Sequence, residues 1–367
     1  MINSFQPALR LAINGFGRIG RNVIRAYFER LCRGGVTAPT VQIVAINDLA
    51  DPQTLLHLLK YDSAHGRLAE RFNIDIRLIS ETATDHQERH FFLVSTPQFA
   101  QRIELLKEPN PQQLPWQALD IDVVLESTGH FRSYADAYLH IQAGAKQVII
   151  GAAPFDTVDA SIVLGVNDHE LTRDKKILSG VSCTTQALVP LLYVLDNALG
   201  IEAAMLTEIH AVTADQTVLD QVHRDLRRAR ASGHNIIPTT SSSINAVARV
   251  LPHMADKING HSIRVPTIDV AAIDVTFSLT KSTTVDAINQ LLLEQSEGHF
   301  SGIMGYSDEP LVSSDFIHQA ESLVIDSLQT MATGSGVNEL FKVFAWYDNE
   351  WGYANRMLDI CRKLAAS

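Results

Sequence analysis

A glycine-rich turn directly after a short apolar run is the feature that most limits what this chain can fold into. Leu9–Asn14 has the composition of a buried strand, and it runs into Gly15–Gly20, which has the spacing GxGxxG. Arg21–Arg33 follows with apolar residues at helical intervals. In this context the first glycine allows a tight turn, the second lets backbone approach a pyrophosphate, and the third lets helix and strand pack closely. The predicted cofactor-binding residues of this turn are Gly15, Phe16, Gly17, Arg18, Ile19 and Gly20.

An acidic residue after the next predicted strand indicates which dinucleotide is bound. Val41–Ile46 is apolar, and Asp48 follows it 28 residues after Gly20, a long spacing that a loop at residues 34–39 explains. A carboxylate at this place holds the ribose diol and repels a 2′-phosphate, so we expect NAD rather than NADP. The alternative is a glycine turn that binds no ligand.

Two further apolar runs, Ile121–Glu126 and Gln147–Ile150, extend the same pattern. Strands that alternate with helices predict an α/β fold with a Rossmann-type, doubly wound parallel sheet whose ligands bind at the carboxyl ends of the strands. Ser127 and Gly129 follow the first of these runs and should line that crevice. Short apolar runs between Arg71 and Gln101 predict a few antiparallel strands beside this sheet.

The composition of the 367-residue chain points to a small-molecule partner in the cytoplasm. A net charge of −11 gives no electrostatic reason to expect nucleic acid. Neither the N-terminal residues Met1–Arg10 nor any later apolar run predicts a secretion signal or a membrane span. Three scattered cysteines predict no disulfide framework, and no His/Cys/Asp cluster has metal-ligand spacing, so we expect no metal.

Gly180–Ala187 places a single cysteine among hydroxyl residues at a predicted strand-to-helix junction. Ser182, Thr184 and Thr185 offer the side-chain oxygens that commonly open a helix. Backbone N–H groups at a helix N-terminus stabilise a thiolate, the nucleophilic form of cysteine. A lone cysteine is more often a small buried apolar residue, so Cys183 becomes a candidate nucleophile only with a base, a cofactor and a substrate clamp beside it.

The second half of the chain supplies candidates for that base and clamp. Ala203–His210 resembles a strand and ends in His210, which could act as an acid or base toward the thiol. Val222–Arg230 concentrates positive charge and is either a solvated basic loop or a site for a phosphate ester, whose oxygens match the arginine fork. Thr239–Ser243 offers hydroxyl donors, and Arg264 is a further candidate.

The remaining patterns define the second domain. Val270–Leu279 alternates as strands do, which predicts an α+β catalytic domain with a mostly antiparallel sheet. Trp346–Tyr353 reads as an aromatic turn before a C-terminal helix that packs on the first domain. We therefore expect an NAD-binding Rossmann domain at 1–182, completed by the helix at 350–367, and a catalytic domain at 183–349.

With these residues assembled, the chain resembles the phosphorylating glyceraldehyde-3-phosphate dehydrogenases over nearly its whole length. Five stretches carry the resemblance: Ile13–Asn22, Lys60–Arg67, Ser182–Thr185, Asp225–Arg230 with Asn235–Pro238, and Trp346–Tyr353. The resemblance implies that Cys183 attacks the aldehyde with His210 as acid or base, that NAD takes the hydride, and that inorganic phosphate cleaves the thioester to an acyl phosphate. It also implies a homotetramer, with the arginine-rich loop at a subunit interface.

The same resemblance implies roles for individual residues. Residues near the substrate's C3 phosphate would be Thr213, Asp215 and Arg264. Residues near the attacking phosphate would be Ser182, Thr184, Ser241 and Arg228, with Ser242 in the same loop. Asn349 would hold the nicotinamide carboxamide, and Tyr353, at the end of its stretch, is expected to contact the cofactor as well.

The chain departs from the family pattern at two places. Gln186-Ala187 stand where the family has Asn-Cys, and Ser241-Ser242 stand where it has Thr-Gly, so a backbone position that favoured glycine carries a side chain. The second departure leaves room for an erythrose-4-phosphate dehydrogenase, which hydrolyses its thioester. A redox-sensing protein that binds NAD without turnover and a metal hydrolase are the more remote alternatives.

Overall fold

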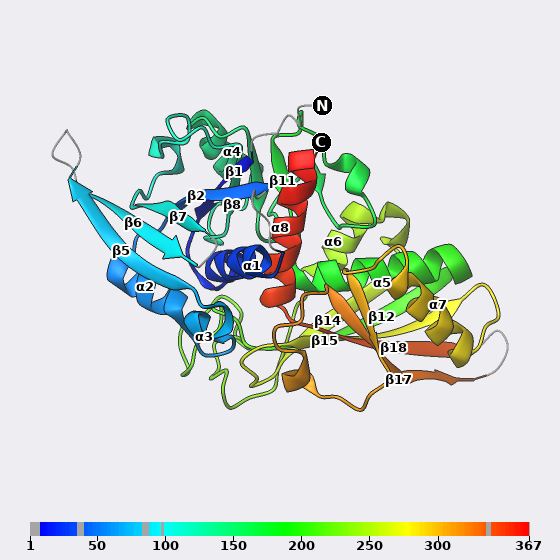
Figure 1. The fold of residues 1–367 in the computed structure, drawn as a ribbon. Helices are drawn as coiled ribbons and strands as arrows, with labels where there is room; N and C mark the ends of the chain where they lie inside the picture. Colours follow the sequence, from blue (N-terminus) through cyan, green and yellow to red (C-terminus); the bar gives the residue numbers. More distant parts are fainter. Residues whose placement is uncertain (1–7, 35–39, 83–87, 97–98, 335–338, 367) are drawn as a thin grey trace. The chain divides into compact units, whose positions relative to one another are not determined.

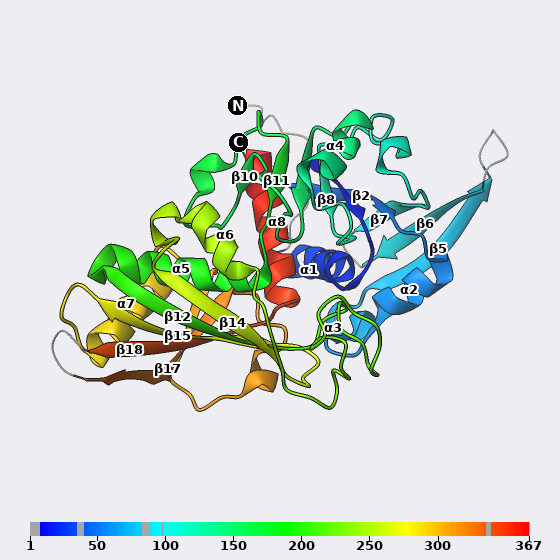
Figure 2. The ribbon, with the colours of Figure 1, turned by 180° about the vertical axis from the view of Figure 1, so that it is seen from behind.

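The computed structural model describes residues 8–34, 40–82, 88–96, 99–334 and 339–366. Residues 35–39 of the loop expected at 34–39 and residues 1–7 of the N-terminal segment lie outside this description. The chain divides into two compact units: the first comprises residues 1–162, 169–180 and 354–367, and the second comprises residues 163–168 and 181–353. Figures 1 and 2 show the elements of both units from opposite sides.

The first unit contains a mostly parallel sheet, a small two-stranded sheet made of β3 and β4, and helices. The strands of this unit are β1 (Leu9–Asn14), β2 (Val41–Asn47), β3 (Tyr61–Asp62), β4 (Gly66–Arg67), β5 (Asp75–Thr82), β6 (Glu88–Ser95), β7 (Ala100–Leu106), β8 (Val123–Glu126), β9 (Gln147–Ile150), β10 (Ala160–Ser161) and β11 (Ile177–Ser179). Its helices are α1 (Arg18–Gly34), α2 (Pro52–Lys60), α3 (Leu68–Phe72) and α4 (Tyr134–Gln142), with α8 (Trp351–Ala366) joining it from Ala354 onward.

The order of the strands places a ligand crevice beside β1. The nine-stranded sheet runs β10-β11-β9-β8-β1-β2-β7-β6-β5. Its pairs are parallel except for β5 with β6 and β6 with β7, which are antiparallel. Chain order reverses direction on the two sides of β1, and such a switch point is where doubly wound sheets bind ligands. The Rossmann-type prediction is thus confirmed, and the antiparallel strands extend this sheet at one edge.

A buried polar network fixes the turn that follows β8. Trp116 Nε1 donates to His140 Nδ1 at 2.9 Å, so the ring hydrogen is on Nε2, which lies 3.1 Å from Glu126 Oε2. The other carboxylate oxygen of Glu126 accepts the backbone N–H of Thr128 at 2.8 Å. Because Glu126 and His140 are fully buried, losing one partner would leave an unsatisfied polar group in the core. The network therefore holds the 127–129 turn beside β1.

The C-terminal helix packs within the first unit. Figures 1 and 2 both show α8 beside α1. Arg30 on α1 donates to Asn355 Oδ1 at 2.9 Å and to Asp359 Oδ1 at 2.5 Å. In the part of this helix that belongs to the first unit, the buried apolar residues are Ala354, Met357, Leu358, Ile360, Cys361 and Leu364.

The second unit is built on the other sheet. Its strands are β12 (Ile201–His210), β13 (Ile237–Thr239), β14 (Ile258–Arg264), β15 (Ala271–Leu279), β16 (Met304–Ser307), β17 (Leu323–Thr333) and β18 (Leu340–Tyr347). Its helices are α5 (Cys183–Leu199), α6 (Ser243–Val250) and α7 (Val285–Glu297). The short 3₁₀ helices η3 (Pro252–Met254) and η4 (Ser313–Phe316) also belong to this unit, whereas η1 (Pro111–Gln113) lies in the first unit and η2 (Asp168–Glu170) crosses the boundary.

The sheet order in this unit is β13-β14-β12-β15-β18-β17-β16. Four of its pairings are antiparallel, and the pairs β12–β14 and β16–β17 are parallel, which confirms the expected mostly antiparallel sheet. Figure 1 shows α5 across one face of the sheet. Apolar side chains of α5 such as Leu188, Leu191 and Leu192 pack with those of β12 and β15 in one core.

Two expected boundaries were wrong. The first helix begins at Arg18 rather than Arg21 because the last three residues of the glycine turn form its first turn. The stretch Trp346–Tyr353 is a turn only at 348–350, since Trp346 and Tyr347 end β18 and α8 begins at Trp351. Asp348 accepts the backbone N–H groups of Glu350 and Trp351 at 2.9 and 2.6 Å, which ends the strand and starts the helix.

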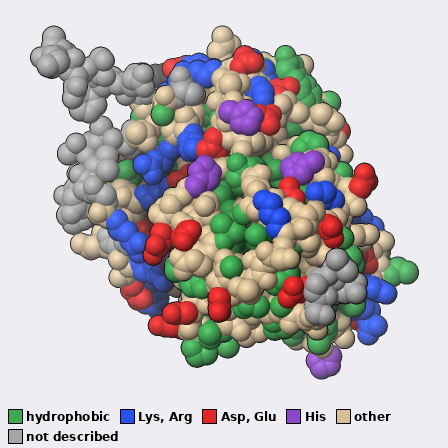
Figure 3. All heavy atoms as spheres, turned by 90° about the vertical axis from the view of Figure 1, so that its right-hand side faces the viewer, with side chains coloured by type: hydrophobic (Ala, Val, Ile, Leu, Met, Phe, Trp, Pro, Cys, Tyr) green, Lys and Arg blue, Asp and Glu red, His purple; other side chains and the backbone are tan. Residues whose placement is uncertain are grey.

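Charged side chains of both signs are exposed on the surface. On the face drawn in Figure 3, acidic and basic side chains stand next to one another around an apolar area. Among the helices in the described part of the chain, none is long and apolar enough to cross a membrane.

We predict that Gly20→Ala destabilises the first unit. A Cβ at Gly20 would lie 2.3 Å from the carbonyl oxygen of Gly15, which is backbone and cannot rotate away. Overpacking of this kind costs about 1–3 kcal/mol, measurable as a lower midpoint in urea unfolding. Gly17→Ala is the matched control because a Cβ there meets nothing within 4 Å. Equal midpoints for the two variants would contradict the argument.

Candidate active site

Cys183 is the first residue of α5, and the turn before it is strained. Ser182 is the N-cap, and its hydroxyl accepts the backbone N–H of Thr185 at 3.1 Å. Val181 has φ 50°, a left-handed conformation that a β-branched residue rarely adopts. Its carbonyl accepts the hydroxyl of Tyr353 at 2.9 Å. The cap and the tyrosine therefore hold the conformation that places the thiol.

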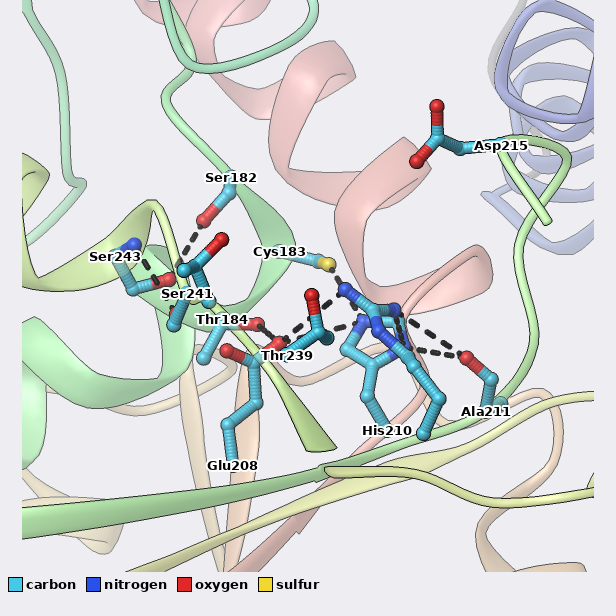
Figure 4. Close-up of polar contacts among 12 residues, drawn as sticks. Ser182, Cys183, Thr184, Glu208, His210, Ala211, Asp215, Thr239, Ser241 and Ser243 are labelled. Atoms are coloured by element: carbon cyan, nitrogen blue, oxygen red, sulfur yellow. Dashed lines mark hydrogen bonds and ion pairs between the residues drawn. The ribbon is translucent and has the colours of Figure 1, made fainter. Parts of the chain in front are cut away.

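Buried and more exposed side chains alternate along β12, and this alternation places the candidate base on the face covered by α5. Ala204, Leu206, Glu208 and His210 are buried, whereas the residues between them are exposed or half-buried. His210 ends the strand, and its Nε2 lies 3.5 Å from Cys183 Sγ. Figure 4 shows the two side chains pointing toward each other from α5 and β12. The structure thus brings the predicted nucleophile and base into contact.

The other ring nitrogen of His210 has two competing partners. The carbonyl oxygen of Ala211 lies 2.7 Å from Nδ1, and Arg264 Nη1 lies 2.6 Å from it. Nδ1 can donate to Ala211 or accept from Arg264, but not both. The first arrangement leaves Nε2 free to take the thiol proton, and the second points an Nε2–H at the sulfur. An anion that draws Arg264 away favours the first arrangement.

The site keeps both reacting groups neutral. Burial, with the Arg264 charge adding to it, lowers the pKa of His210 to about 4. Although Cys183 is only half-buried as a residue, burial of its thiol and the Glu208 charge raise its pKa to about 12, against an opposing effect of Arg264. This corrects the expectation of a thiolate stabilised by the helix N-terminus. The pair is instead a thiol facing an unprotonated imidazole, as in general-base activation.

Arg264 has capacity for an anion. It is 9% exposed, its Nε is buried without a hydrogen-bond partner, and its Nη2 lies 3.9 Å from Glu208. An arginine with unused donors in a buried place is a fit for a phosphate oxygen. Thr213, assigned with it by resemblance, is half-buried just beyond the end of β12.

Arg228 and Asp215, which were assigned to different phosphates, face each other. Arg228 Nη1 lies 2.5 Å from Asp215 Oδ2, and its Nε donates to Thr239 Oγ1 at 3.0 Å. Burial opposes ionisation of Asp215, but the Arg228 hydrogen bond and charge outweigh it and lower its pKa. Part of the Arg228 charge is thus already neutralised before any phosphate binds.

The serines of the 241–243 segment lie beside the cysteine turn. Ser243 Oγ is 3.1 Å from Ser182 Oγ, and the half-buried Ser241 accepts the Ser243 backbone N–H at 3.2 Å. Ser242 is exposed and has φ −76° and ψ −10°. Any residue adopts this right-handed conformation, so the concern that this position favours glycine is not supported by its backbone.

Sequence reasoning missed two residues of the site, Glu208 and Tyr347. Glu208 Oε1 accepts the hydroxyl of Thr184 at 3.0 Å, and the Tyr347 hydroxyl lies 2.7 Å from the same Thr184 oxygen. The single hydrogen of Thr184 goes to the carboxylate, so Tyr347 donates to Thr184. Burial raises the pKa of Tyr347, which keeps it a donor. The sequence could have indicated Glu208, because it stands two residues before His210 in β12 and so lies on the same face of the strand.

The first unit brings the predicted dinucleotide residues together at the ends of β1, β2 and β8. The Phe16 backbone N–H donates to Asp48 Oδ2 at 2.7 Å, and Ser127 Oγ donates to the Gly15 carbonyl at 2.7 Å. Gly15 has φ 92° and packs against the Thr128 backbone, where a Cβ would come within 2.5 Å. Exposed Gly129 lies in the same turn as Ser127.

Gly17 leaves the open place that a pyrophosphate requires. It is exposed, a Cβ there would meet nothing within 4 Å, and α1 begins one residue later. The backbone N–H groups of the first helical turn have no partners within the helix and attract anions. These residues therefore fit NAD. The Phe16 side chain is buried, so it can approach a ligand only through its backbone.

Arg18 connects two of the stretches that carry the family resemblance. Its guanidinium pairs with Asp62, which lies within Lys60–Arg67. Burial opposes ionisation of Asp62, but hydrogen bonds from Arg18 and from the His65 backbone outweigh it and lower its pKa to about 2. Ile19, next in the turn, is half-buried.

Asn349 and Tyr353 belong to the second unit. Asn349 is buried, and its Oδ1 has no hydrogen-bond partner, so it can accept an amide N–H such as that of a carboxamide. Tyr353 is buried with its hydroxyl on Val181. Contact of either residue with the cofactor stays a prediction.

We predict that Gly17→Ala weakens NAD binding without unfolding the chain. The added methyl group fills the open space above the turn, so the affinity should fall at least about tenfold, or ~1.4 kcal/mol. Calorimetric titration with NAD measures this. Gly233→Ala, an exposed glycine with equally open surroundings, should bind NAD normally, and unchanged affinity of Gly17→Ala would exclude a pyrophosphate at this turn.

We also predict that alkylation of free Cys183 by iodoacetamide accelerates about tenfold per pH unit between pH 7 and 9. A thiol whose pKa lies near 12 gains thiolate in that proportion. His210, with a pKa near 4, does not titrate in this range. The labelled residue is identified by mass spectrometry, with Cys183→Ser as the blank for Cys32 and Cys361. A rate that is already constant below pH 8 would indicate an ion pair of thiolate and imidazolium instead.

Comparison with known families covers most of both units. Residues 9–134 match the family model for the NAD binding domain of glyceraldehyde 3-phosphate dehydrogenase. Residues 182–349 match the model for the C-terminal domain of the same enzyme. The matches include the glycine turn with Asp48 and the segment that holds Cys183, His210 and Arg264, and they make NAD the cofactor of an oxidoreductase. The chain belongs to the glyceraldehyde-3-phosphate dehydrogenase family.

Proposed function

We propose that this protein oxidises D-glyceraldehyde 3-phosphate with NAD and phosphorylates the product to 1,3-bisphosphoglycerate through a thioester on Cys183. The observation that carries the proposal is the 3.5 Å contact between Cys183 Sγ and His210 Nε2, with the unpartnered Nε of Arg264 in the same buried site. In this proposal residues 1–182 and 350–367 bind NAD, and residues 183–349 carry out the chemistry.

His210 moves the protons of the reaction. Its free Nε2 takes the thiol proton as Sγ adds to the aldehyde carbon and returns it to the oxygen, giving a hemithioacetal. The glycine turn and Asp48 would hold NAD, which would supply the acceptor for the hydride that leaves that carbon. His210 takes the hydroxyl proton as the carbonyl reforms, which leaves a thioester on Cys183 and an imidazolium beside it.

Two phosphate sites complete the proposal. Arg264, together with Thr213 and Asp215, would hold the C3 phosphate of the substrate. Inorganic phosphate would attack the thioester from a site formed by the residues Ser182, Thr184, Arg228, Ser241 and Ser242. The attack breaks the carbon–sulfur bond, and the thiolate takes back a proton from His210.

Exposed apolar side chains support the expected homotetramer. In the arginine-rich segment, Val218, Leu219, Val222 and Leu226 are 80%, 75%, 98% and 83% exposed. Met205, Leu328, Met331 and Leu340 are exposed on strands β12, β17 and β18. Apolar side chains clustered on one segment or sheet are typical of protein interfaces.

The test compares initial rates of NADH formation from D-glyceraldehyde 3-phosphate and D-erythrose 4-phosphate, each with and without inorganic phosphate. We expect the first aldehyde to give the higher kcat/KM and phosphate to accelerate its turnover. Faster, phosphate-independent turnover of erythrose 4-phosphate would replace the proposal with its closest alternative, a D-erythrose-4-phosphate dehydrogenase.

Cys183→Ser is the control for the covalent step. It should reduce turnover to background while NAD still binds with unchanged affinity, since the cysteine lies outside the dinucleotide turn. Undiminished activity would exclude the thiol mechanism. If the unsubstituted protein turned over none of the aldose phosphates, an NAD-binding redox sensor would be the better description.

A further inference from the structure

Glu208 is a buried carboxylate in the active site with an unused oxygen. It is 3% exposed, and its Oε2 is buried without a hydrogen-bond partner. Its Oε1 lies 3.9 Å from both His210 Nε2 and Arg264 Nη2. Figure 4 shows the carboxylate below Thr184, the residue after the nucleophile. A buried charge with one unsatisfied oxygen is costly for the fold, so a role in the chemistry is the explanation to test.

The proton balance leaves a role for a second base. Once the thioester has formed, His210 carries the proton of the oxidised hydroxyl and cannot accept another until that proton is released. A phosphate dianion can attack without a base because it is already anionic, but water is a poor nucleophile until a base removes a proton. Glu208 is an acceptor within the same site that remains available at this stage.

The hydrogen bonds of Glu208 also weaken the site for attacking phosphate. The only hydroxyl hydrogen of Thr184 is donated to Glu208 Oε1, and Tyr347 donates to the Thr184 oxygen. Thr184 therefore has no hydrogen left for a phosphate oxygen. The carboxylate repels an incoming dianion, and Asp215 already neutralises part of Arg228. Water, which is neutral, is not excluded by these charges.

We propose that the Cys183 thioester can also be hydrolysed, and that Glu208 is the base that activates the attacking water molecule. The inference rests on the proposed function, because it needs the thioester. The water oxygen bonds to the thioester carbon while one water proton passes to Glu208. The carbon–sulfur bond breaks, the thiolate takes the proton from His210, and the carboxylic acid leaves. No further oxidant is consumed, and Glu208 returns its proton to solvent.

The experiment follows NADH in a stopped-flow instrument with D-glyceraldehyde 3-phosphate and saturating NAD, first without inorganic phosphate. The unsubstituted protein should show a first-turnover burst followed by steady turnover. Glu208→Gln should form NADH in the burst but then turn over about 100-fold more slowly, the scale of a lost general base. Added phosphate should restore turnover in Glu208→Gln, which a generally damaged site would not allow.

Two further variants separate charge from position. Glu202→Gln removes a carboxylate from an exposed position of the same strand, and its phosphate-free turnover should be unchanged. Glu208→Asp keeps the charge but withdraws it by one methylene group, and it should restore part of the phosphate-free turnover lost in Glu208→Gln.

A measurement on the unsubstituted protein covers the case in which Glu208→Gln does not fold. Phosphorus NMR of the products in phosphate buffer should show the free phospho-acid forming faster than the acyl phosphate hydrolyses alone. Absence of that acid, no phosphate-free turnover after a clear burst, or phosphate-free turnover of Glu208→Gln within twofold of the unsubstituted protein would overturn the role of Glu208. Absence of any NADH formation, with or without phosphate, would overturn the proposed function and this inference with it.

Discussion

The contact between the Cys183 thiol and the His210 imidazole depends on where one helix begins. If α5 started a residue later or earlier, the sulfur would move by about 100° around the helix axis and away from β12. The Ser182 cap and the left-handed Val181 fix that start. A left-handed β-branched residue destabilises the fold by about 1–3 kcal/mol, and the N-cap hydrogen bond offsets about 1 kcal/mol of this. The Tyr353 hydroxyl on the Val181 carbonyl adds to the offset.

The charged groups around that contact keep one donor and one acceptor unused. Arg264 keeps an unpartnered Nε, and Glu208 keeps an unpartnered Oε2, although the two side chains are only 3.9 Å apart. A closer pair would satisfy both groups but would leave no donor for a substrate phosphate and no acceptor for a proton. Both buried groups therefore carry a desolvation cost that a ligand with a matching donor or acceptor would reduce.

Elements governed by local pattern were predictable from the sequence. The bounds of β1 and the end of β12 at His210 agree with the structure because apolar alternation and glycine turns are local signals. The first helix was placed three residues too late because glycine was taken as turn alone. The turn at Trp346 was placed too early because aromatic residues suit both a strand end and a turn.

The electrostatics of the site could not be obtained from local pattern. A helix N-terminus favours a thiolate, yet burial and Glu208, brought by another strand, raise the pKa of Cys183 instead. The relative weight of these effects depends on distances that only the tertiary structure supplies. The same holds for the pairing of Asp215 with Arg228, which the resemblance had assigned to separate phosphates.

Glu208 could have been recognised from the alternation of buried and exposed positions along β12. Ala204 and Leu206 precede it on the core face of β12, and His210 follows it, so a core position is occupied by a carboxylate. Breaks in an apolar pattern of this kind are selected against unless the charge has a task. His210 breaks the same pattern and has the thiol as its partner. Oε2 of Glu208 has no hydrogen-bond partner, and the missing partner is best sought among the reactants.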